Sequence, residues 1–219
     1  MHPAQATNPI LRECREHTRA QQITRPQRAL CVAVTNLLSG LLLAAWLLLE
    51  VVLRSGEEAR SWQAGPADRA STRLVVVAYV VAFVGPFLLD TSGVGVTHAG
   101  SALAWIGVTI GVVGLGIRVW SMRILGRDYT RSLRTRETQT VIDRGPYRLV
   151  RHPGYSGSIL VWFGSRLAVN WLIAAATAVG LLLVYAYRIR AEEEMLIDHF
   201  GDAYRAYKVR TWRLVPYIW

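Results

Sequence analysis

Long apolar stretches alternate with polar segments along this chain of 219 residues. The first stretch covers residues 29–53 and contains one charged residue, Glu50, near its end. The second covers residues 74–89, and the third covers residues 101–125. A helix rises about 1.5 Å per residue, so roughly 20 apolar residues cross a hydrocarbon core of about 30 Å. We therefore expect one membrane-spanning helix in each of these three stretches.

A fourth apolar stretch, residues 158–187, is interrupted by Arg166 and Asn170. It is too long for one straight crossing of about 20 residues. Two shorter helices that turn near Asn170 fit this length better and form a helical hairpin. The chain is thus predicted to be an all-α integral membrane protein with about five transmembrane helices.

The polar segments divide the chain into three parts. Residues 1–28 form a polar tail without the pattern of a signal peptide, and we expect a loosely ordered interfacial segment there. Residues 29–125 carry the first three spans. Residues 126–219 carry the hairpin and are predicted to be the catalytic half. Its final segment, residues 188–219, is expected to contain a cytosolic helix through about Lys208 and then an extended tail.

Residues 126–157 break the apolar pattern. They contain seven arginines and no apolar run longer than two residues, which indicates an extramembrane segment. Loops longer than about 12–15 residues are usually functional or disordered, and the aromatic residues and glycines of this one argue against disorder. We therefore expect a functional region here.

Composition supports a membrane protein and indicates its orientation. Hydrophobic residues make up 52% of the chain and charged residues 18%, whereas soluble domains carry about 25% charged residues. The net charge of +10 fits arginines that contact anionic lipids better than it fits nucleic-acid binding. Because basic loops stay in the cytosol, segments 126–157 and 188–219 are predicted to be cytosolic. Five spans then place the N-terminus outside, a placement that the five arginines of the tail oppose.

Two glycines of the third stretch, Gly107 and Gly111, stand four residues apart. Small residues at this spacing let helix backbones approach each other closely in lipid. A glycine-rich span without special packing is an equally good interpretation, so the sequence leaves both open.

The sequence gives no sign of a disulfide framework or a metal site. Its two cysteines, Cys14 and Cys31, have no metal-ligand spacing, and no second His or Cys lies at ligand spacing from His152. The pattern also contains nothing that indicates an oligomeric state.

The segment 144–157 is predicted to be a turn-rich platform. Pro146 and Pro153 fix backbone angles, while the glycines at positions 145, 154 and 157 permit tight turns. Such a backbone presents amide groups to a ligand, and Tyr147 and Tyr155 are able to flank an adenine ring. His152 taken alone is better explained as a residue that caps the next helix.

A second cluster lies where the last apolar stretch ends. Arg188 and Glu192 are four residues apart, so they share one face of a helix. Arg188 alone fits a side chain that snorkels to the membrane surface. Glu192, the first of three consecutive glutamates, is able to accept hydrogen bonds from a ribose or an amine.

Together these clusters resemble the isoprenylcysteine carboxyl methyltransferase family, and the likeness covers roughly residues 115–217. It rests on the order and spacing of several elements, none of which is specific alone. They are Gly145-x-Tyr147-x-x-x-Arg151-His152-Pro153-x-Tyr155-x-Gly157, Arg188-x-x-x-Glu192-Glu193, Phe200-Gly201-x-x-Tyr204-x-x-Tyr207 and a closing Pro216.

The resemblance implies a bacterial member of the family, in the inner membrane, that encloses S-adenosylmethionine at its cytosolic face. It also implies which residues form the site. Arg188 corresponds to an arginine at the substrate and is the expected catalytic residue. Gln139 departs from the His of some eukaryotic members. The implied cofactor-binding residues are Gln139, Thr140, Val141, Ile142, Tyr147, His152, Pro153, Gly154, Tyr155 and Glu192.

The implied chemistry is methyl transfer to a lipophilic or lipidated substrate that enters from the bilayer. A carboxylate, such as that of a prenylated cysteine, is negative at neutral pH and needs no general base. Arg188 is able to orient such an anion with its forked guanidinium group. Other lipophilic carboxylates, a small thiol and a phospholipid amine remain alternative acceptors.

Two other functions compete with this interpretation. Membrane sterol reductases that use NADPH share an Arg-His-Pro-x-Tyr-x-Gly motif, but they typically have Asn in place of Gly154 and an acidic residue in place of Ser158. The second rival is a non-catalytic membrane scaffold or a transporter, for which Arg166 within an apolar stretch marks a polar pathway. The dense motifs outside the spans favour an enzyme.

Overall fold

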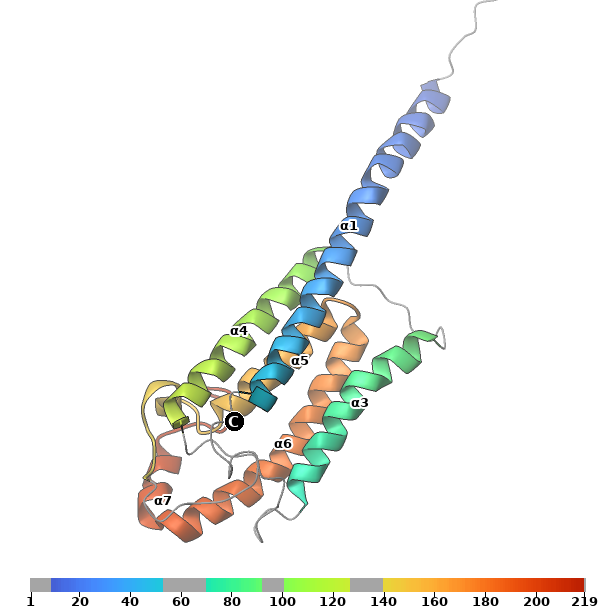
Figure 1. Cartoon of the computed structure of the whole chain (residues 1–219). Coiled ribbons are helices and arrows are strands. Elements are labelled where there is room, and N and C mark those ends of the chain that lie inside the picture. The colour runs from blue at the N-terminus through green and yellow to red at the C-terminus, as the bar shows by residue number, and fades with distance from the viewer. Residues whose placement is uncertain (1–8, 53–69, 92–100, 127–139, 219) are drawn as a thin grey trace, which may run out of the picture.

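The computed structural model describes the backbone of residues 9–52, 70–91, 101–126 and 140–218 (Figure 1). Side chains are described for residues 29–50, 70–86, 102–126 and 140–218. The described residues form helices, apart from turns and one isolated parallel bridge between Val150 and Trp212. In chain order the elements are α1 (Pro9–Val52), α3 (Ser71–Thr91), α4 (Ser101–Leu125), the 3₁₀ helix η3 (Gly145–Arg148), α5 (Pro153–Leu167), α6 (Trp171–Phe200) and α7 (Asp202–Val209). The predicted all-α fold is confirmed.

Five helices lie side by side in an elongated bundle, and α7 lies at one end of it (Figure 1). Helix α5 contacts α4, α1 and α6, so it occupies the middle of the bundle. Helix α3 packs on α6. The buried core follows this arrangement and centres on Trp46, Val161, Trp162 and Tyr185.

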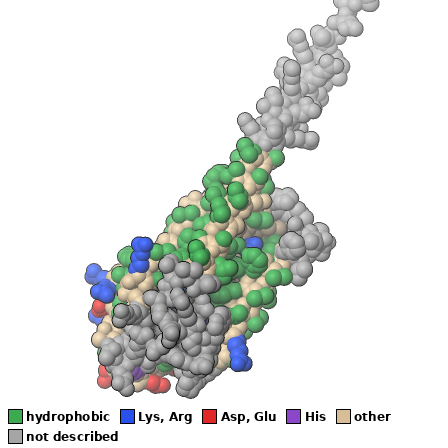
Figure 2. Space-filling model, in the orientation of Figure 1, with side chains coloured by type: hydrophobic (Ala, Val, Ile, Leu, Met, Phe, Trp, Pro, Cys, Tyr) green, Lys and Arg blue, Asp and Glu red, His purple; other side chains and the backbone are tan. Residues whose placement is uncertain are grey.

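Within the described residues, three helical segments are long and apolar enough to cross a membrane: Ala29–Glu50, Ala102–Leu125 and Trp171–Phe200. Apolar side chains cover the shaft of the bundle, while charged side chains gather at the end near α7 (Figure 2). Among the outward-facing residues, Leu183 is 68% exposed and Val81 is 62% exposed. These surfaces suit contact with lipid chains, which impose no penalty on exposed apolar groups.

Helix α3 has 21 residues, whereas α5 has 15 residues. A helix of the latter length rises about 22 Å, less than a hydrocarbon core of about 30 Å. The predicted hairpin is present, because α5 ends at Leu167 and Asn170 caps α6 by accepting hydrogen bonds from Leu172 N and Ile173 N.

One sequence-based expectation about the chain ends is wrong, and another is confirmed with one break in the helix. Residues 9–28 are helical and continue directly into the first span, in place of a loosely ordered segment. Their Arg, Gln, Glu and Ala residues favour helix, and extension of an existing helix needs no new nucleus. The helix expected through about Lys208 is present, but it continues α6 to Phe200 and breaks at Gly201 before α7 ends at Val209. Gly201 has a φ of +57°, which favours glycine.

Helices α4 and α5 pack against each other through glycines, which confirms the close-approach interpretation. A Cβ atom on Gly107 would lie 2.6 Å from the carbonyl oxygen of Gly164, and one on Gly114 would lie 2.7 Å from that of Gly157. On Gly111 it would lie 2.9 Å from a side-chain carbon of Leu42 in α1. The expected turn at Gly157 is wrong: this glycine lies inside α5 and admits the backbone of α4.

Candidate functional site

The platform is built by η3, residues 149–152 and the first turn of α5. Gly145 has a φ of +60°, which lets the chain turn into η3, and Pro146 begins that helix. Pro153 begins α5, so its missing N–H group costs no helical hydrogen bond. His152 occupies the N-cap position, but its side chain makes no capping hydrogen bond. The predicted position of His152 at the start of the next helix is confirmed, although its side chain does not make the capping bond.

The C-terminal tail holds the platform through backbone hydrogen bonds. Trp212 N donates to Leu149 O at 3.0 Å, Arg151 N donates to Trp212 O at 2.7 Å, and His152 N donates to Arg213 O at 3.0 Å. This pairing resembles one short piece of parallel sheet. It fixes the backbone just before His152, a role for the tail that its sequence did not indicate.

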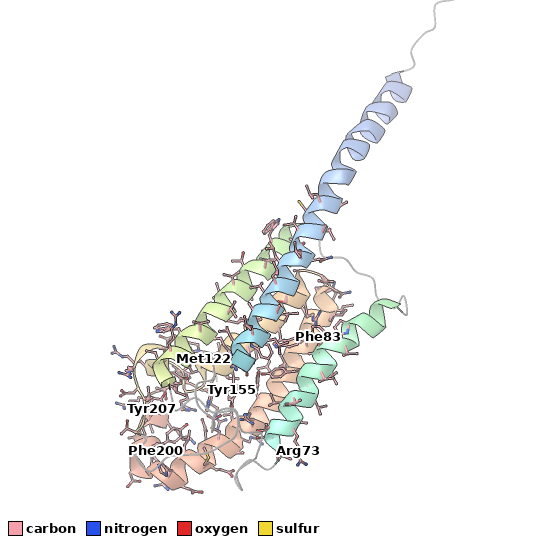
Figure 3. The ribbon with its side chains drawn as sticks, in the orientation of Figure 1. Arg73, Phe83, Met122, Tyr155, Phe200 and Tyr207 are labelled. Atoms are coloured by element: carbon pink, nitrogen blue, oxygen red, sulfur yellow. The ribbon has the colours of Figure 1, made fainter. Side chains whose placement is uncertain are left out.

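Three predicted site residues meet in one hydrogen-bonded chain. The Tyr155 hydroxyl accepts a hydrogen bond from Arg188 Nε at 2.7 Å and donates one to Glu192 Oε2 at 2.8 Å. Tyr155 lies inside the bundle, toward the end at which Arg73 marks the start of α3 (Figure 3). The Tyr155 side chain, which comes from α5, thus connects Arg188 and Glu192, which lie one helical turn apart on α6.

Arg188 is 5% exposed and does not snorkel. Its Nη1 atom donates to Ser71 Oγ at 3.1 Å and to Thr72 Oγ1 at 2.9 Å, both at the start of α3. The guanidinium group is therefore held from two sides, by Tyr155 and by the hydroxyls of α3. Ser71 and Thr72 were not predicted from the sequence, because both lie before the apolar stretch that begins at residue 74.

His152 lies beside this chain of contacts. Its ring stacks on Tyr155 with centroids 5.7 Å apart. Its Nδ1 lies 3.8 Å from Glu192 Oε2, and its Nε2 lies 3.5 Å from Glu193 Oε1. The Nε2 atom is buried and makes no hydrogen bond to any part of the chain that the structure describes. This ring nitrogen thus faces the Glu193 carboxylate.

Glu193 is a buried residue of the site that was not among the residues predicted from the sequence. It is 2% exposed, and its carboxylate contacts Arg151 Nε at 2.8 Å, Lys208 Nζ at 3.1 Å and Arg213 Nη2 at 3.2 Å. These ion pairs join α6 to the platform, to α7 and to the tail. Three consecutive glutamates do not reveal which of them faces inward, because that depends on how α6 is rotated in the bundle.

The remaining predicted cofactor residues lie around the platform. Tyr147 is buried in η3, and its carbonyl accepts a 2.7 Å hydrogen bond from the Tyr207 hydroxyl. Burial raises the pKa of Tyr207, so this hydroxyl keeps its proton at neutral pH. Pro153 and Gly154 are buried in the first turn of α5.

The segment that precedes η3 is placed only in part. Thr140 is exposed, whereas Val141 and Ile142 are half-buried. Gln139 lies outside the described residues. Cofactor contacts by this segment stay a prediction. Among the described residues, no three His, Cys, Asp or Glu side chains lie together in a way that could hold a metal ion.

Arg118 of α4 is a second buried residue at the site that was not predicted from the sequence. It contacts the first turn of α5, which is part of the platform. It is 2% exposed, donates to Gly154 O at 2.7 Å through Nη1, and forms an ion pair with Glu50 of α1 through Nη2. A signal for this pair was present, since each charge interrupts an apolar stretch, and ionisable residues inside spans are usually functional.

Comparisons with known proteins agree with the motifs. Residues 105–198 match the sequence model described as the isoprenylcysteine carboxyl methyltransferase (ICMT) family. A probable protein-S-isoprenylcysteine O-methyltransferase from Oryza sativa subsp. indica is 30% identical over 119 residues, 53% of this chain and 62% of the relative. Methanethiol S-methyltransferase 1 of Bradyrhizobium diazoefficiens is 40% identical over 73 residues, 32% of this chain and 24% of that protein.

Among solved structures, the eukaryotic intramembrane Ras methyltransferase ICMT matches with a TM-score of 0.49 and 22% identity, over 67% of this chain and 52% of that chain. The chain spans about three fifths of the length of the rice relative. The family match starts and ends earlier than the range 115–217 expected from the motifs, but it contains the platform, Arg188 and Glu192. Residues 105–198 are thus similar in sequence to the isoprenylcysteine carboxyl methyltransferase family.

Proposed function

We propose that the protein is a membrane methyltransferase that uses S-adenosylmethionine and methylates a lipophilic acceptor. The observation that carries this proposal is the chain of contacts from Arg188 through Tyr155 to Glu192. In this chain of contacts, the Arg188 cation and the Glu192 carboxylate lie on either side of one tyrosine, where they would serve the acceptor and the cofactor.

The platform has groups that fit the cofactor. The Glu192 side chain is 25% exposed, so its carboxylate is able to accept hydrogen bonds from a ribose or an amine. The buried His152 ring stacks on Tyr155 and borders the same carboxylate. When bound, S-adenosylmethionine supplies an electrophilic methyl group on a sulfonium centre. The residues of this chain orient the acceptor and exclude water.

Arg188 determines which acceptors suit the site. A guanidinium group fixed by Tyr155, Ser71 and Thr72 needs little reorganisation before it binds an anion. A carboxylate fits its forked geometry, and it is nucleophilic at neutral pH without a base. A carboxyl group on a lipidated cysteine, as in the names of several relatives, is therefore the first candidate.

A thiol acceptor is the second candidate, because one relative is named methanethiol S-methyltransferase 1. In that case Arg188 would favour the thiolate over the thiol. The reductase interpretation is less well supported, since Ser158 is fully buried and its hydroxyl accepts a 3.0 Å hydrogen bond from Trp46 Nε1. An acidic residue typical of reductases would introduce a charge into this core.

The experiment uses the full chain in lipid nanodiscs. Calorimetry with S-adenosylmethionine, and with NADPH as the competing cofactor, tests the cofactor class. Transfer of a labelled methyl group is then measured on a prenylcysteine analogue, a fatty carboxylate, a small thiol and a phospholipid amine. NADPH binding without S-adenosylmethionine binding would overturn the proposal.

Arg188→Ala is expected to keep cofactor binding and lose most turnover. Arg190→Ala, an exposed arginine two residues away on the same helix, is the matched control and is expected to behave as wild type. Unchanged turnover in Arg188→Ala would contradict the role of this residue as the acceptor-binding group.

The site is proposed to face the cytosol of a bacterial inner membrane. Support comes from the basic residues at this end of the bundle, which include Arg151, Lys208 and Arg213 near the site. Reporter fusions at the two termini test the orientation. A cytosolic reporter signal at the C-terminus is expected, and a periplasmic signal there would reverse the assignment.

A further inference from the structure

Arg118 is a buried charge in the middle of the bundle that the proposed chemistry does not use. It lies in α4, within a candidate membrane span, and is 2% exposed. Its two terminal nitrogens reach different partners, Gly154 O on α5 at 2.7 Å and the Glu50 carboxylate on α1. One side chain thus joins three helices at the first turn of the platform.

Packing alone does not explain this arrangement. A buried ion pair seldom stabilises a fold more than apolar residues of the same volume, because both charges lose their hydration. A cation beside the first turn of a helix also opposes the positive end of the helix dipole. Glu50, with a side chain 12% exposed, offsets that charge. The remaining role for Arg118 is to determine where Gly154 lies.

The glycine contacts bring Arg118 to this position. A Cβ atom on Gly157 would lie 2.8 Å from Arg118 N and 2.7 Å from Gly114 O. Any larger residue at position 157 would push α4 away from α5 and lift Arg118 from the Gly154 carbonyl. Gly157 of the platform motif is therefore explained by the approach of α4.

We propose that Arg118 is a positioning residue that holds the first turn of α5 in its cofactor-binding geometry through the Gly154 carbonyl, with Glu50 orienting its guanidinium group. This inference rests on the proposed function, because it assigns Pro153 and Gly154 to the cofactor platform. It predicts that Arg118 affects binding of S-adenosylmethionine more than it affects the acceptor.

The test compares the full-length wild type with the double variant Arg118→Gln/Glu50→Gln, which leaves neither charge buried alone. Arg123→Gln, at an exposed position of the same helix, is the control. Loss of one charge-assisted hydrogen bond is expected to raise the Kd of S-adenosylmethionine by calorimetry about tenfold to a hundredfold. The KM of the acceptor and kcat at saturating cofactor are expected to stay near wild type, and amide exchange in peptides covering 153–160 is expected to speed up.

The outcomes separate this inference from the proposed function. If the wild type does not bind S-adenosylmethionine, the proposed function fails and this inference fails with it. If the wild type binds and the folded double variant binds equally well, the inference alone is overturned. A parallel loss of cofactor affinity, acceptor affinity and unfolding temperature would show a purely structural role and would also overturn it.

A second variant decides the question if the double variant does not fold. Arg118→Lys keeps the charge but cannot reach Gly154 O and Glu50 with two separate nitrogens. Its Kd for S-adenosylmethionine is expected to rise while the KM of the acceptor stays unchanged. A cofactor affinity equal to that of the wild type would overturn the inference.

Discussion

Arg166, in the last turn of α5, donates a 2.9 Å hydrogen bond to the backbone carbonyl of Ala82 in α3. That carbonyl has no helical partner, because the residue four positions later is Pro86, which lacks an N–H group. The guanidinium group also lies over the Trp162 ring, 5.7 Å from its centroid. Arg166 therefore completes a proline-containing helix, and this contact accounts for the charge without the polar pathway that a transporter would need.

The contribution of Arg166 to the free energy of unfolding is therefore expected to depend on Pro86. Arg166→Met is expected to lower the free energy of unfolding by about 1.5–3 kcal/mol, because a hydrogen bond from a charged donor is lost. In a Pro86→Ala background, the restored N–H group satisfies Ala82 O and the loss is expected to be smaller. Chemical unfolding in detergent of both single variants and the double variant measures the coupling. Additive effects would contradict the assignment.

The α3 hydroxyls are expected to act on the acceptor through Arg188. The double variant Ser71→Ala/Thr72→Val removes both hydrogen bonds to Nη1 and keeps the shapes of the side chains. Loss of these two hydrogen bonds is expected to weaken acceptor binding by about 1–2 kcal/mol. This should raise the KM of the acceptor roughly five- to thirtyfold. Binding of S-adenosylmethionine is expected to be unchanged. Arg73→Ala, at an exposed neighbouring position, serves as control, and an equal KM in all three proteins would argue against this role.

Glu193 is expected to contribute to stability more than its neighbour does. Glu193→Gln leaves Arg151, Lys208 and Arg213 without their shared carboxylate, and this should lower the free energy of unfolding by about 3 kcal/mol. Glu194→Gln, at an exposed position, is expected to have a small effect. Thermal unfolding in nanodiscs compares the two. Equal unfolding temperatures would show that the cluster is not needed for folding.

The glycine contacts between α4 and α5 are expected to tolerate no side chain. In Gly107→Ala, the new Cβ atom would meet backbone atoms of Gly164 and Ala168 at 2.6 Å, and backbone cannot move aside cheaply. A loss of about 1–3 kcal/mol is expected. Gly116→Ala on the same helix meets nothing within 4 Å and is expected to stay within about 0.5 kcal/mol of wild type. The same loss in both variants would refute the packing argument.

The sequence alone determined the features that depend on neighbouring residues. Apolar length predicted the positions of the bundle helices, since burial in lipid requires a minimum run of apolar residues. The length of the fourth apolar stretch and its interruption at Asn170 predicted the hairpin, and the Asn170 side chain caps its second helix. The spacing of Arg188 and Glu192 placed them on one face, and the helical period by itself gives that result.

Only the tertiary structure decided which of these faces meet. Ser71 is 117 positions from Arg188, and Arg118 is 36 positions from Gly154. The rotation of α6 sets Glu193 inward and leaves Glu194 exposed. The tail pairs with residues 149–152 although no local pattern marks it. Such contacts depend on how whole helices pack, and packing is a sum over many distant residues that no single stretch of sequence contains.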